Sequence, residues 1–405
     1  MTAPGILYIS YDGMLEPLGQ SQVLAYLERL APRYRIHLVS FEKKSDFADA
    51  ARRAAVAERM AAANIGWTPL RYHKAPTAPA TAWDVAVGTA VALRLARRHR
   101  LRIVHARSYI PALMALAVKR LLGARLLFDM RGLWADERVD AGLWPAGGRL
   151  YRMTKALERR FLLAADHVVT LTHASAAEIR RFPYMADRPI PITVIPTCAD
   201  LDRFSRRENA PHDRFTYGFV GAASTWSLFD EVLASFLLLR EIRPDARLLV
   251  VNRGEHGYIE QRIAASGVAR ALVDLVAAEH RDVPELVSRM DVAAALRKPA
   301  YSQVACAPTK LAEYLGCGVP CLVNRGIGDV AEIVEQERVG IVAEGFSREQ
   351  LGTAVRGLVA LAAEPEVRQR CMAAARRRFS LEAGVGAYQA IYETLLGRAS
   401  GEVVP

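Results

Sequence analysis

The stretch Ala307–Asn324, A-P-T-K-L-A-E-Y-L-G-C-G-V-P-C-L-V-N, constrains the fold and the site of this 405-residue chain more than any other. Pro308 has a fixed φ that suits the first turn of a helix, and it lacks an N–H group that would go unbonded there. We therefore expect a helix that starts at this proline and ends at Gly316 and Gly318, followed by a buried strand, Val319–Val323.

The start of this helix is predicted to bind an anion. The amides of Thr309, Lys310 and Leu311 would point out of the helix start, where unpaired donors coincide with the positive end of the helix dipole. Lys310 would add a full positive charge. Glu313, one turn further on the same face, can accept from hydroxyl groups near that anion. A phosphate and a diol held at a fixed distance indicate a nucleotide-sugar, although an ordinary helix with a charged face would show the same residues.

Size and composition predict a globular protein of two domains. The chain is 52% hydrophobic and 24% charged, which is enough for two ordinary cores. No apolar run reaches the roughly 18 residues of a membrane span, and the N-terminus lacks the basic region of a secretory signal. Five scattered cysteines indicate reduced thiols in a cytoplasmic protein. Cys317 and Cys321 lack further ligands nearby, so we expect neither a metal site nor a cofactor.

The net charge of +11 indicates an acidic partner. Basic clusters occur at 94–102, 149–160 and 376–378, which could equally be solvated helix faces. No nucleic-acid recognition motif is visible and aromatic residues do not interleave with the charges, so we do not expect nucleic acid as a partner. A peripheral contact with an anionic membrane, at its inner face, or with a lipid-pyrophosphate acceptor fits the charge better.

Strands and helices alternate along both halves of the chain, which predicts parallel sheets covered by helices. Strands are expected at Gly5–Tyr11, Arg35–Phe41, Trp67–Tyr72, Arg102–His105, Ala124–Asp129, His167–Thr172, Thr193–Pro196, Thr216–Gly221, Arg247–Asn252 and Asp291–Leu296. Helices are expected near 46–63, 82–99, 110–121, 148–164, 174–181, 228–242, 257–265 and 283–289, with a last amphipathic segment, 379–396. Tyr388 and Tyr392, spaced i, i+4, would anchor that last helix.

Ligands of such sheets bind at the carboxyl ends of the strands. In the first half this rule selects His105, with Arg107 and Ser108, and Asp129, with Arg131 and Gly132. His105 could equally be a satisfied, half-buried residue. For Asp129 and Arg131 a function is favoured, because two opposite charges after an apolar strand need a reason.

Two loops of the first half are further candidates. The loop D-G-M-L-E-P-L-G-Q leads from the first strand into a helix near Gly19, although it lacks the glycine pattern of a dinucleotide site. The segment Trp134–Trp144 is expected to be a long loop that carries Trp134, Asp136 and Glu137. Aromatic rings beside carboxylates suit the binding of an acceptor sugar. Tryptophans that only pack a surface loop would give the same sequence pattern.

The order of these segments resembles family-four glycosyltransferases, retaining enzymes of the GT-B fold, and the loop around Gly19 looks like a branch found in surface-polysaccharide clusters. In that family a Glu-x7-Glu motif opens the helix that ends in a Cys-Gly-x-Pro-like turn. Glu313 matches the second glutamate, which takes the ribose hydroxyls, whereas Ala305 stands where the first would be. Gly19 and Gln20 match the loop whose backbone approaches the donor phosphate.

Two more positions depart from the family pattern. Arg131 replaces a usual histidine, which would suit an acidic sugar. The Arg and Lys that clamp the donor diphosphate are absent after Gly221, where the chain reads A-A-S-T-W-S. We expect Lys298 to supply the charge, with Arg297 and Lys310 nearby. Ser224 and Thr225 would donate hydrogen bonds.

The resemblance implies two doubly wound, Rossmann-like domains that face each other across a cleft. The expected parts are an acceptor-binding domain at 1–200, a linker at 201–213, a nucleotide-sugar domain at 214–380 and a helix at 381–405 that returns to the first domain. The implied activity is metal-independent transfer, with retention, from a nucleoside-diphosphate sugar to a glycan or lipid-linked acceptor. His105, Asp129 and Arg131 would position the sugar. A non-catalytic scaffold of a polysaccharide assembly, or less readily a nucleotide-sugar epimerase, remains an alternative.

Overall fold

The computed structural model describes residues 3–186, 188–205, 214–279 and 281–397. The chain divides into two compact units. Unit 1 comprises Met1–Ile195 together with Glu382–Pro405, and unit 2 comprises Pro196–Leu381. Most of the expected linker, from 206 onward, falls outside the described residues.

Unit 1 is built on a parallel sheet of seven strands in the order β3-β2-β1-β4-β5-β6-β7. The strands are β1 Gly5–Ser10, β2 Arg35–Glu42, β3 Gly66–Arg71, β4 Ile103–Arg107, β5 Arg125–Asp129, β6 His167–Thr170 and β7 Ile192–Val194. The helices are α1 Pro17–Gly19, α2 Ala25–Leu30, α3 Lys44–Ala48, α4 Ala50–Ala62, α5 Thr77–His99, α6 Tyr109–Leu122, α7 Trp134–Asp140, α8 Arg149–Ala164 and α9 His173–Arg181. Strand β1, between β2 and β4, is buried along its whole length, as its apolar run predicts.

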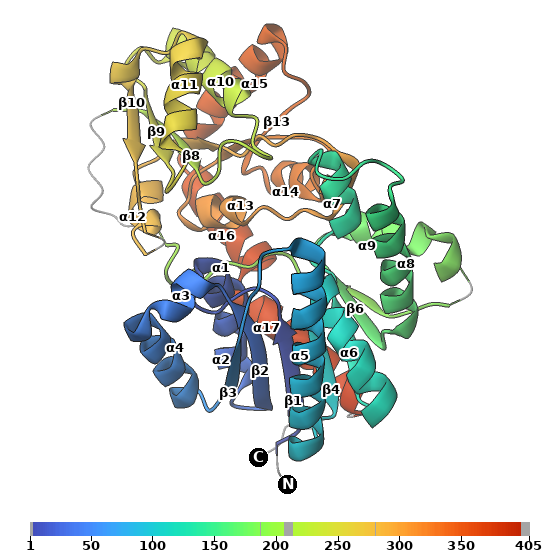
Figure 1. Ribbon diagram of the computed structural model, residues 1–405. Coiled ribbons are helices and arrows are strands. Elements are labelled where there is room, and N and C mark those ends of the chain that lie inside the picture. The colour runs from blue at the N-terminus through green and yellow to red at the C-terminus, as the bar shows by residue number, and fades with distance from the viewer. Residues whose placement is uncertain (1–2, 187, 206–213, 280, 398–405) are drawn as a thin grey trace. The chain divides into compact units, whose positions relative to one another are not determined.

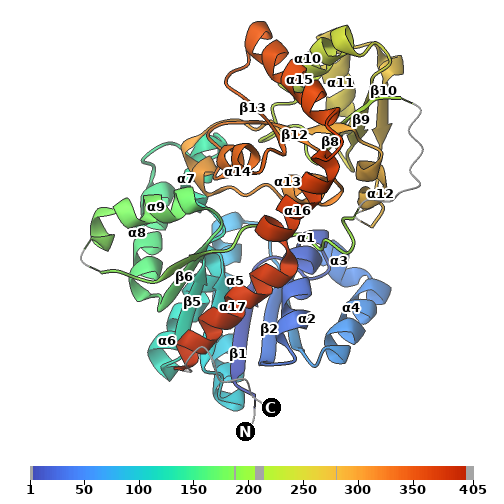
Figure 2. The same ribbon diagram turned by 180° about the vertical axis from the view of Figure 1, so that it is seen from behind.

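The last helix, α17 (Leu381–Leu396), packs on this sheet and confirms the anchoring role of its tyrosines. Figure 1 shows α5 and α6 in front of the sheet of unit 1, and Figure 2 shows α17 crossing its opposite face. Val385, Tyr388 and Tyr392 are buried at helical spacing. Tyr392 donates or accepts a hydrogen bond with His105 Nδ1 at 2.7 Å, so the chain end is part of unit 1.

Unit 2 has a parallel sheet of six strands in the order β10-β9-β8-β11-β12-β13, with one apolar core on each face. The strands are β8 Thr216–Val220, β9 Arg247–Val251, β10 Val273–Val276, β11 Val292–Ala294, β12 Cys321–Asn324 and β13 Gly340–Ala343. The helices are α10 Phe229–Ile242, α11 His256–Ser266, α12 Val283–Ser288, α13 Thr309–Gly316, α14 Val330–Glu337, α15 Arg348–Ala362 and α16 Val367–Phe379. Two Rossmann-like sheets with a C-terminal helix on the first are the GT-B fold that the sequence predicts.

Two local expectations were wrong. The segment after Leu133 is not one long loop, because Trp134–Asp140 forms helix α7 with Asp136 and Glu137 in its first turn, where carboxylates suit the helix dipole. The helix expected over 46–63 is interrupted at Asp49, whose side chain accepts from Arg52 N and caps α4. The edge strands β10 and β13 and the helices α14, α15 and α16 were not predicted from the sequence. Of the described residues, no helix combines the length and apolarity needed to cross a bilayer.

Candidate functional site

The start of α13 leaves backbone donors unpaired, as the sequence predicts. Pro308 is the cap residue, with φ −65° and ψ 122°, and no side chain caps the helix. The backbone amides of Thr309 and Lys310 therefore have no acceptor carbonyl within the helix, because no helical turn precedes them. The Leu311 amide already donates to the Pro308 carbonyl at 3.1 Å, so it is a weaker candidate than the first two.

Lys310 directs its ammonium group into the interior of unit 2. Its Nζ is buried without a hydrogen-bond partner among the described residues and lies 4.4 Å from the ring centroid of Phe219, on β8. Burial, with a smaller effect of nearby Arg297, lowers the pKa of Lys310 to about 7. A buried cation without a hydrogen-bond partner is costly, so Lys310 is a candidate for binding an anion.

Glu313 is the second unsatisfied group of α13. It is 8% exposed, and its carboxylate has no hydrogen bond or ion pair within the described part of the chain. Burial raises the pKa of Glu313 to about 7, although Lys310 and Arg203 pull it in the opposite direction. Two buried groups of opposite charge, one turn apart and without side-chain hydrogen bonds among the described residues, make the start of α13 a candidate ligand site.

The loop after β8 lies beside the ammonium group of Lys310. Gly221 has φ +99°, and a Cβ at this position would come within 3.8 Å of Lys310 Nζ. Asn252 Nδ2 donates to the Gly221 carbonyl at 3.0 Å, and Glu255 accepts from the Ala223 amide at 2.6 Å. The Ser224 hydroxyl also donates to Glu255, so this serine takes part in holding the loop.

Hydrogen bonding keeps the anchor of this loop ionised. Burial alone would raise the pKa of Glu255, but hydrogen bonds from Ser224, Ala223 N and Asn252 outweigh it and hold that pKa below its usual value. Thr225 is exposed. The sequence analysis missed Asn252 and Glu255. Their position at and just after the carboxyl end of β9 is the signal that could have selected them.

The two cations that follow β11 differ in their surroundings. Arg297 is partly buried and donates to Gln303 Oε1 from Nε at 3.2 Å and from Nη2 at 3.0 Å. Lys298 is exposed, and only its backbone has a hydrogen bond, to the Trp226 carbonyl at 2.9 Å, among the described contacts. Of the three cations considered near the nucleotide loop, Lys310 alone has a buried, unpaired charge in the described structure.

In unit 1, the loop after β1 is held by a buried carboxylate that the sequence analysis missed. Glu42 accepts from the amides of Met14 at 2.9 Å and Leu15 at 3.1 Å. Gly19 packs so closely that an added Cβ would lie 2.0 Å from the Gly13 carbonyl oxygen. Gln20 begins a π-helical turn, Gln20–Leu24, a feature that is frequent at functional sites.

Asp129 lies at the centre of a buried charged cluster at the ends of β4 and β5. Its carboxylate is 3.5 Å from His105 Nε2, 3.8 Å from Arg107 Nη1 and 3.6 Å from Arg131 Nη1. Tyr388 of α17 donates to Asp129 at 3.0 Å. The structure therefore brings the three predicted catalytic residues together, with His105 and Asp129 fully buried.

The charges of this cluster follow from their mutual contacts. Burial alone would raise the pKa of Asp129, but Arg131, His105 and Arg107 outweigh it and hold that pKa well below its usual range. Burial lowers the pKa of His105, which is therefore neutral near pH 7. Ser108, which follows Arg107, has φ +73°, and this strain at the strand end marks the same edge. Of His105, Asp129 and Arg131, only Arg131 is both charged and partly exposed, with 14% of its side chain accessible to solvent.

The predicted acceptor residues lie on α7 and are engaged within unit 1. Trp134 stacks edge-on against Trp144, with ring centroids 5.4 Å apart. Asp136 is buried and accepts from Tyr151 and Lys155, each at 3.0 Å. Glu137 is half-buried on the same helix. Within the described residues, no group of three or more His, Cys, Asp or Glu side chains could hold a metal ion.

Comparisons with known proteins place both halves of the chain. Residues 19–203 match the model described as Glycosyltransferase Family 4, and residues 200–378 match the model described as Glycosyl transferases group 1. The two matches adjoin and together span the chain from the glycine loop to α16. No curated protein matches the sequence.

Solved structures share the fold at low sequence identity. A glycosyltransferase from Rickettsia africae matches with a TM-score of 0.70 and 14% identity, covering 98% of this chain and 99% of that one. A sucrose-phosphate synthase from Thermosynechococcus elongatus matches with a TM-score of 0.72 and 14% identity over 97% and 99%. Anabaena HepE in complex with UDP and glucose matches with a TM-score of 0.62 and 16% identity over 96% and 98%.

Proposed function

Because this chain belongs to the family-four glycosyltransferases, a family of retaining enzymes that use nucleotide-sugars, we propose a specific reaction for it. It transfers a sugar, with retention and without a metal ion, from a nucleoside-diphosphate sugar to a glycan or lipid-linked acceptor. The setting is surface-polysaccharide synthesis on the cytoplasmic side of the membrane. The observation that carries the proposal is the pair Lys310 and Glu313, buried on α13 without hydrogen-bond partners among the described residues.

In this proposal α13 binds the donor. The Thr309 and Lys310 amides and the Lys310 ammonium take the diphosphate, and Glu313 accepts from the ribose hydroxyls. Lys310, rather than the exposed Lys298, replaces the missing cation clamp, because its charge is already desolvated beside Gly221. The leaving diphosphate is thereby stabilised by fixed charges that need no reorganisation. We assign Lys298, Ser224, Thr225 and Leu311 to the margin of the α13 site, and Gly19 and Gln20 keep their predicted role in donor binding.

The Asp129 cluster positions the transferred sugar. His105 and Asp129 are too deeply buried to attack a substrate. Asp129, itself in contact with His105, holds Arg131, which presents the cation to the sugar. The acceptor hydroxyl attacks the transferred sugar from the same face from which the diphosphate leaves. A donor phosphate oxygen takes the proton of that hydroxyl. The acceptor binds near α7, where Trp134 and Glu137 are half-buried and Asp136 supports the helix.

Replacing Arg131 by alanine is expected to reduce transfer at least 100-fold while donor affinity changes less than about threefold. The arginine belongs to unit 1, whereas the donor diphosphate is bound by α13. Turnover with the preferred donor and a titration of that donor measure the two effects separately. Arg131→Lys is the matched control, since it keeps the positive charge but loses the planar guanidinium group. Wild-type turnover of Arg131→Ala would remove this residue from the mechanism.

Donor affinity is expected to be highest near pH 7. Both the Lys310 and Glu313 groups have a pKa of about 7 in the free protein. Acidification protonates Glu313 and removes the ribose acceptor, and alkalinisation neutralises Lys310 and removes the diphosphate partner. Titrations with the intact nucleotide-sugar from pH 5.5 to 8.5 test this, because its diphosphate does not titrate in that range. Glu313→Gln should flatten the acid limb and move the alkaline limb to lower pH, because the Glu313 charge raises the pKa of Lys310. Lys310→Met should flatten the alkaline limb and move the acid limb to higher pH, because Lys310 lowers the pKa of Glu313. An affinity of the wild type that is independent of pH contradicts the assignment.

A thermal-shift screen against UDP-, GDP-, ADP- and CMP-sugars identifies the donor, since a ligand at about 100 times its Kd stabilises the fold by roughly 2.7 kcal/mol. Release of free nucleotide from the stabilising donor supports the transferase, and tight binding without turnover supports a non-catalytic scaffold. Conversion of the sugar without an acceptor supports an epimerase.

A further inference from the structure

Helices α5, α6 and α8 form the layer on one face of the sheet of unit 1 (Figure 1). The exposed charges of these three helices are all positive. The only acid of α5, Asp84, and the only acid of α8, Glu158, are buried, and α6 has none. The exposed arginines are Arg94, Arg97, Arg98 and Arg100 at the end of α5, Arg120 on α6, and Arg149, Arg152, Arg159 and Arg160 on α8. We call this surface the α5–α6–α8 face.

The positive charge of this face is not neutralised by the protein itself. In the described ranges of the chain, none of these arginines forms an ion pair. Some exposed arginines elsewhere in the chain do have acidic partners: Arg253 pairs with Glu279 at 3.1 Å, and Arg348 pairs with Glu241 at 2.5 Å. On the α5–α6–α8 face, nine exposed arginines gather on helices that present no exposed acid, so the face suits an external anion.

Large apolar side chains are exposed among the same arginines. Leu121 is 69% exposed at the end of α6, and Met153 is 55% exposed in the arginine-rich part of α8. Trp83, Leu122 and Leu150 add to this apolar surface. Guanidinium groups interleaved with leucine, methionine and tryptophan suit a lipid interface, which accepts both phosphate contacts and shallow apolar insertion. A nucleic-acid backbone offers no partner for these aliphatic groups.

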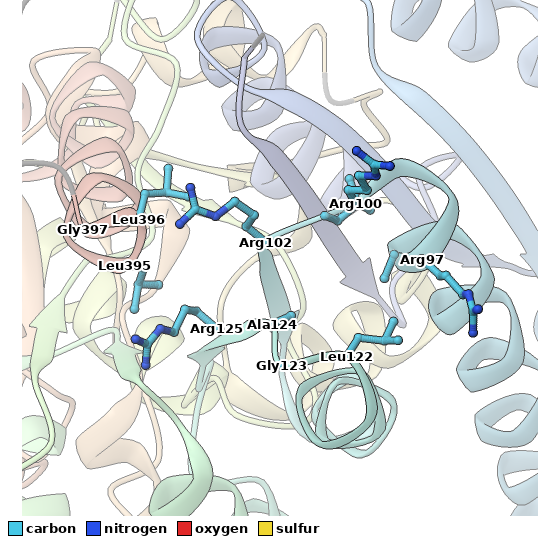
Figure 3. A pocket seen from close by; sticks show the side chains of 12 residues that line it. Arg97, Arg100, Arg102, Leu122, Gly123, Ala124, Arg125, Leu395, Leu396 and Gly397 are labelled. Carbon is cyan, nitrogen blue, oxygen red and sulfur yellow. The ribbon is translucent and has the colours of Figure 1, made fainter. Parts of the chain in front are cut away.

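Two hollows at the α6 end show that the charges are spread rather than focused. One, of about 380 Å³, lies between α6 and α8 and is lined by Arg120, Arg159 and Arg160. The other, of about 480 Å³, is lined by four arginines. Figure 3 shows Arg102 and Arg125 pointing toward Leu395 and Leu396, whereas Arg97 points away from them. The guanidinium groups do not converge on one small anion, so an extended anionic surface fits them better.

We propose that the α5–α6–α8 face docks on a bilayer that contains anionic phospholipids. All three helices begin at the carboxyl edge of the sheet, where Asp129 and Arg131 lie, because each runs antiparallel to the strands it follows. Arg149 and Arg152, at the start of α8, lie toward that edge, whereas the arginines at the ends of α5, α6 and α8 lie toward the opposite edge. A bilayer that docks along the whole face therefore reaches the carboxyl edge and can present a lipid-linked acceptor there. This purpose rests on the proposed function, whereas the docking itself does not.

Vesicle flotation of the full-length chain tests the docking. We expect binding to phosphatidylcholine vesicles with about 30% phosphatidylglycerol and little binding to phosphatidylcholine alone. The variant R97Q/R120Q/R152Q/R160Q should lose at least about 100-fold in partitioning, since each arginine near an anionic surface contributes several-fold. The control R253Q/R281Q/R289Q/R348Q removes the same charge from unit 2 and should bind like wild type. Equal loss in both variants would overturn the proposal.

Two further measurements separate the possible causes. L121S/L150S/M153S keeps every charge and should weaken binding about tenfold; unchanged binding would overturn the insertion of these side chains. Preferred binding of wild type to single-stranded RNA over anionic vesicles would assign the face to nucleic acid instead. Turnover on a soluble acceptor without vesicles should be the same in wild type and R97Q/R120Q/R152Q/R160Q, so a failure of docking is distinguishable from a failure of the proposed reaction.

Discussion

Replacing Glu313 by alanine is expected to weaken binding of the nucleoside-diphosphate donor about 10- to 100-fold, because hydrogen bonds to a charged group contribute roughly 1.5–3 kcal/mol. The folded protein should be as stable as wild type or more stable. The reason is that the carboxylate is buried without a hydrogen bond or ion pair among the described residues, so its removal breaks no hydrogen bond and removes only its electrostatic support of Lys310. Calorimetric titration and thermal melting of the free variant measure the two effects.

Glu332→Ala is the matched control for this experiment. Glu332 lies exposed on α14 of the same unit, so its removal changes the net charge equally without touching α13. Unchanged donor affinity in Glu313→Ala would discard the ribose assignment. A marked loss of stability in the free variant would show instead that Glu313 is a structural residue of unit 2.

Asp129→Ala is expected to destabilise unit 1 by about 3–5 kcal/mol, the cost of breaking a buried ion pair by removing one partner. The substitution leaves Arg107 and Arg131 without their shared carboxylate and removes the acceptor of the Tyr388 hydroxyl. The effect should extend to α17, because Tyr388 and Tyr392 join that helix to this cluster. Asp129→Asn keeps the shape but not the charge and should have an intermediate effect.

Hydrogen exchange of peptides from β5 and α17 in increasing urea measures the change for unit 1, since a chain of two units need not unfold in one step. Glu58→Ala, which removes an exposed carboxylate of α4 in the same unit, is the control. If Asp129→Ala unfolds like this control, the cluster is not a structural centre of unit 1.

Local sequence signals predicted the elements that position both sites. Pro308 and Gly318 flank helix α13, and their backbone constraints can be read from the sequence without knowledge of the fold. Gly318 has φ +76°, a value that favours glycine. The alternation of buried strands and helices predicted both sheets. The edge strands β10 and β13 were not predicted; each has only one buried residue, so neither shows the continuous buried run of the inner strands.

The chemical state of the site residues could not be read from the sequence. Lys310 is desolvated by Phe219 and repelled by Arg297, which lie elsewhere in the chain, so sequence reasoning favoured Lys298 instead. Likewise, the burial of His105 and Asp129 depends on tyrosines of α17, more than 250 residues later, as the Asp129–Tyr388 separation of 259 shows. Glu42 and Glu255 hold their loops through backbone amides that no short motif reveals.

The central claim is that α13 binds a diphosphate through Lys310. The most direct test titrates wild type and Lys310→Met with two ligands, the nucleoside and the nucleoside diphosphate of the preferred donor. The account predicts that the variant loses at least about tenfold in affinity for the diphosphate, the worth of one charge-assisted contact, and keeps its affinity for the nucleoside. An equal loss for both ligands, or no loss for the diphosphate, would contradict it.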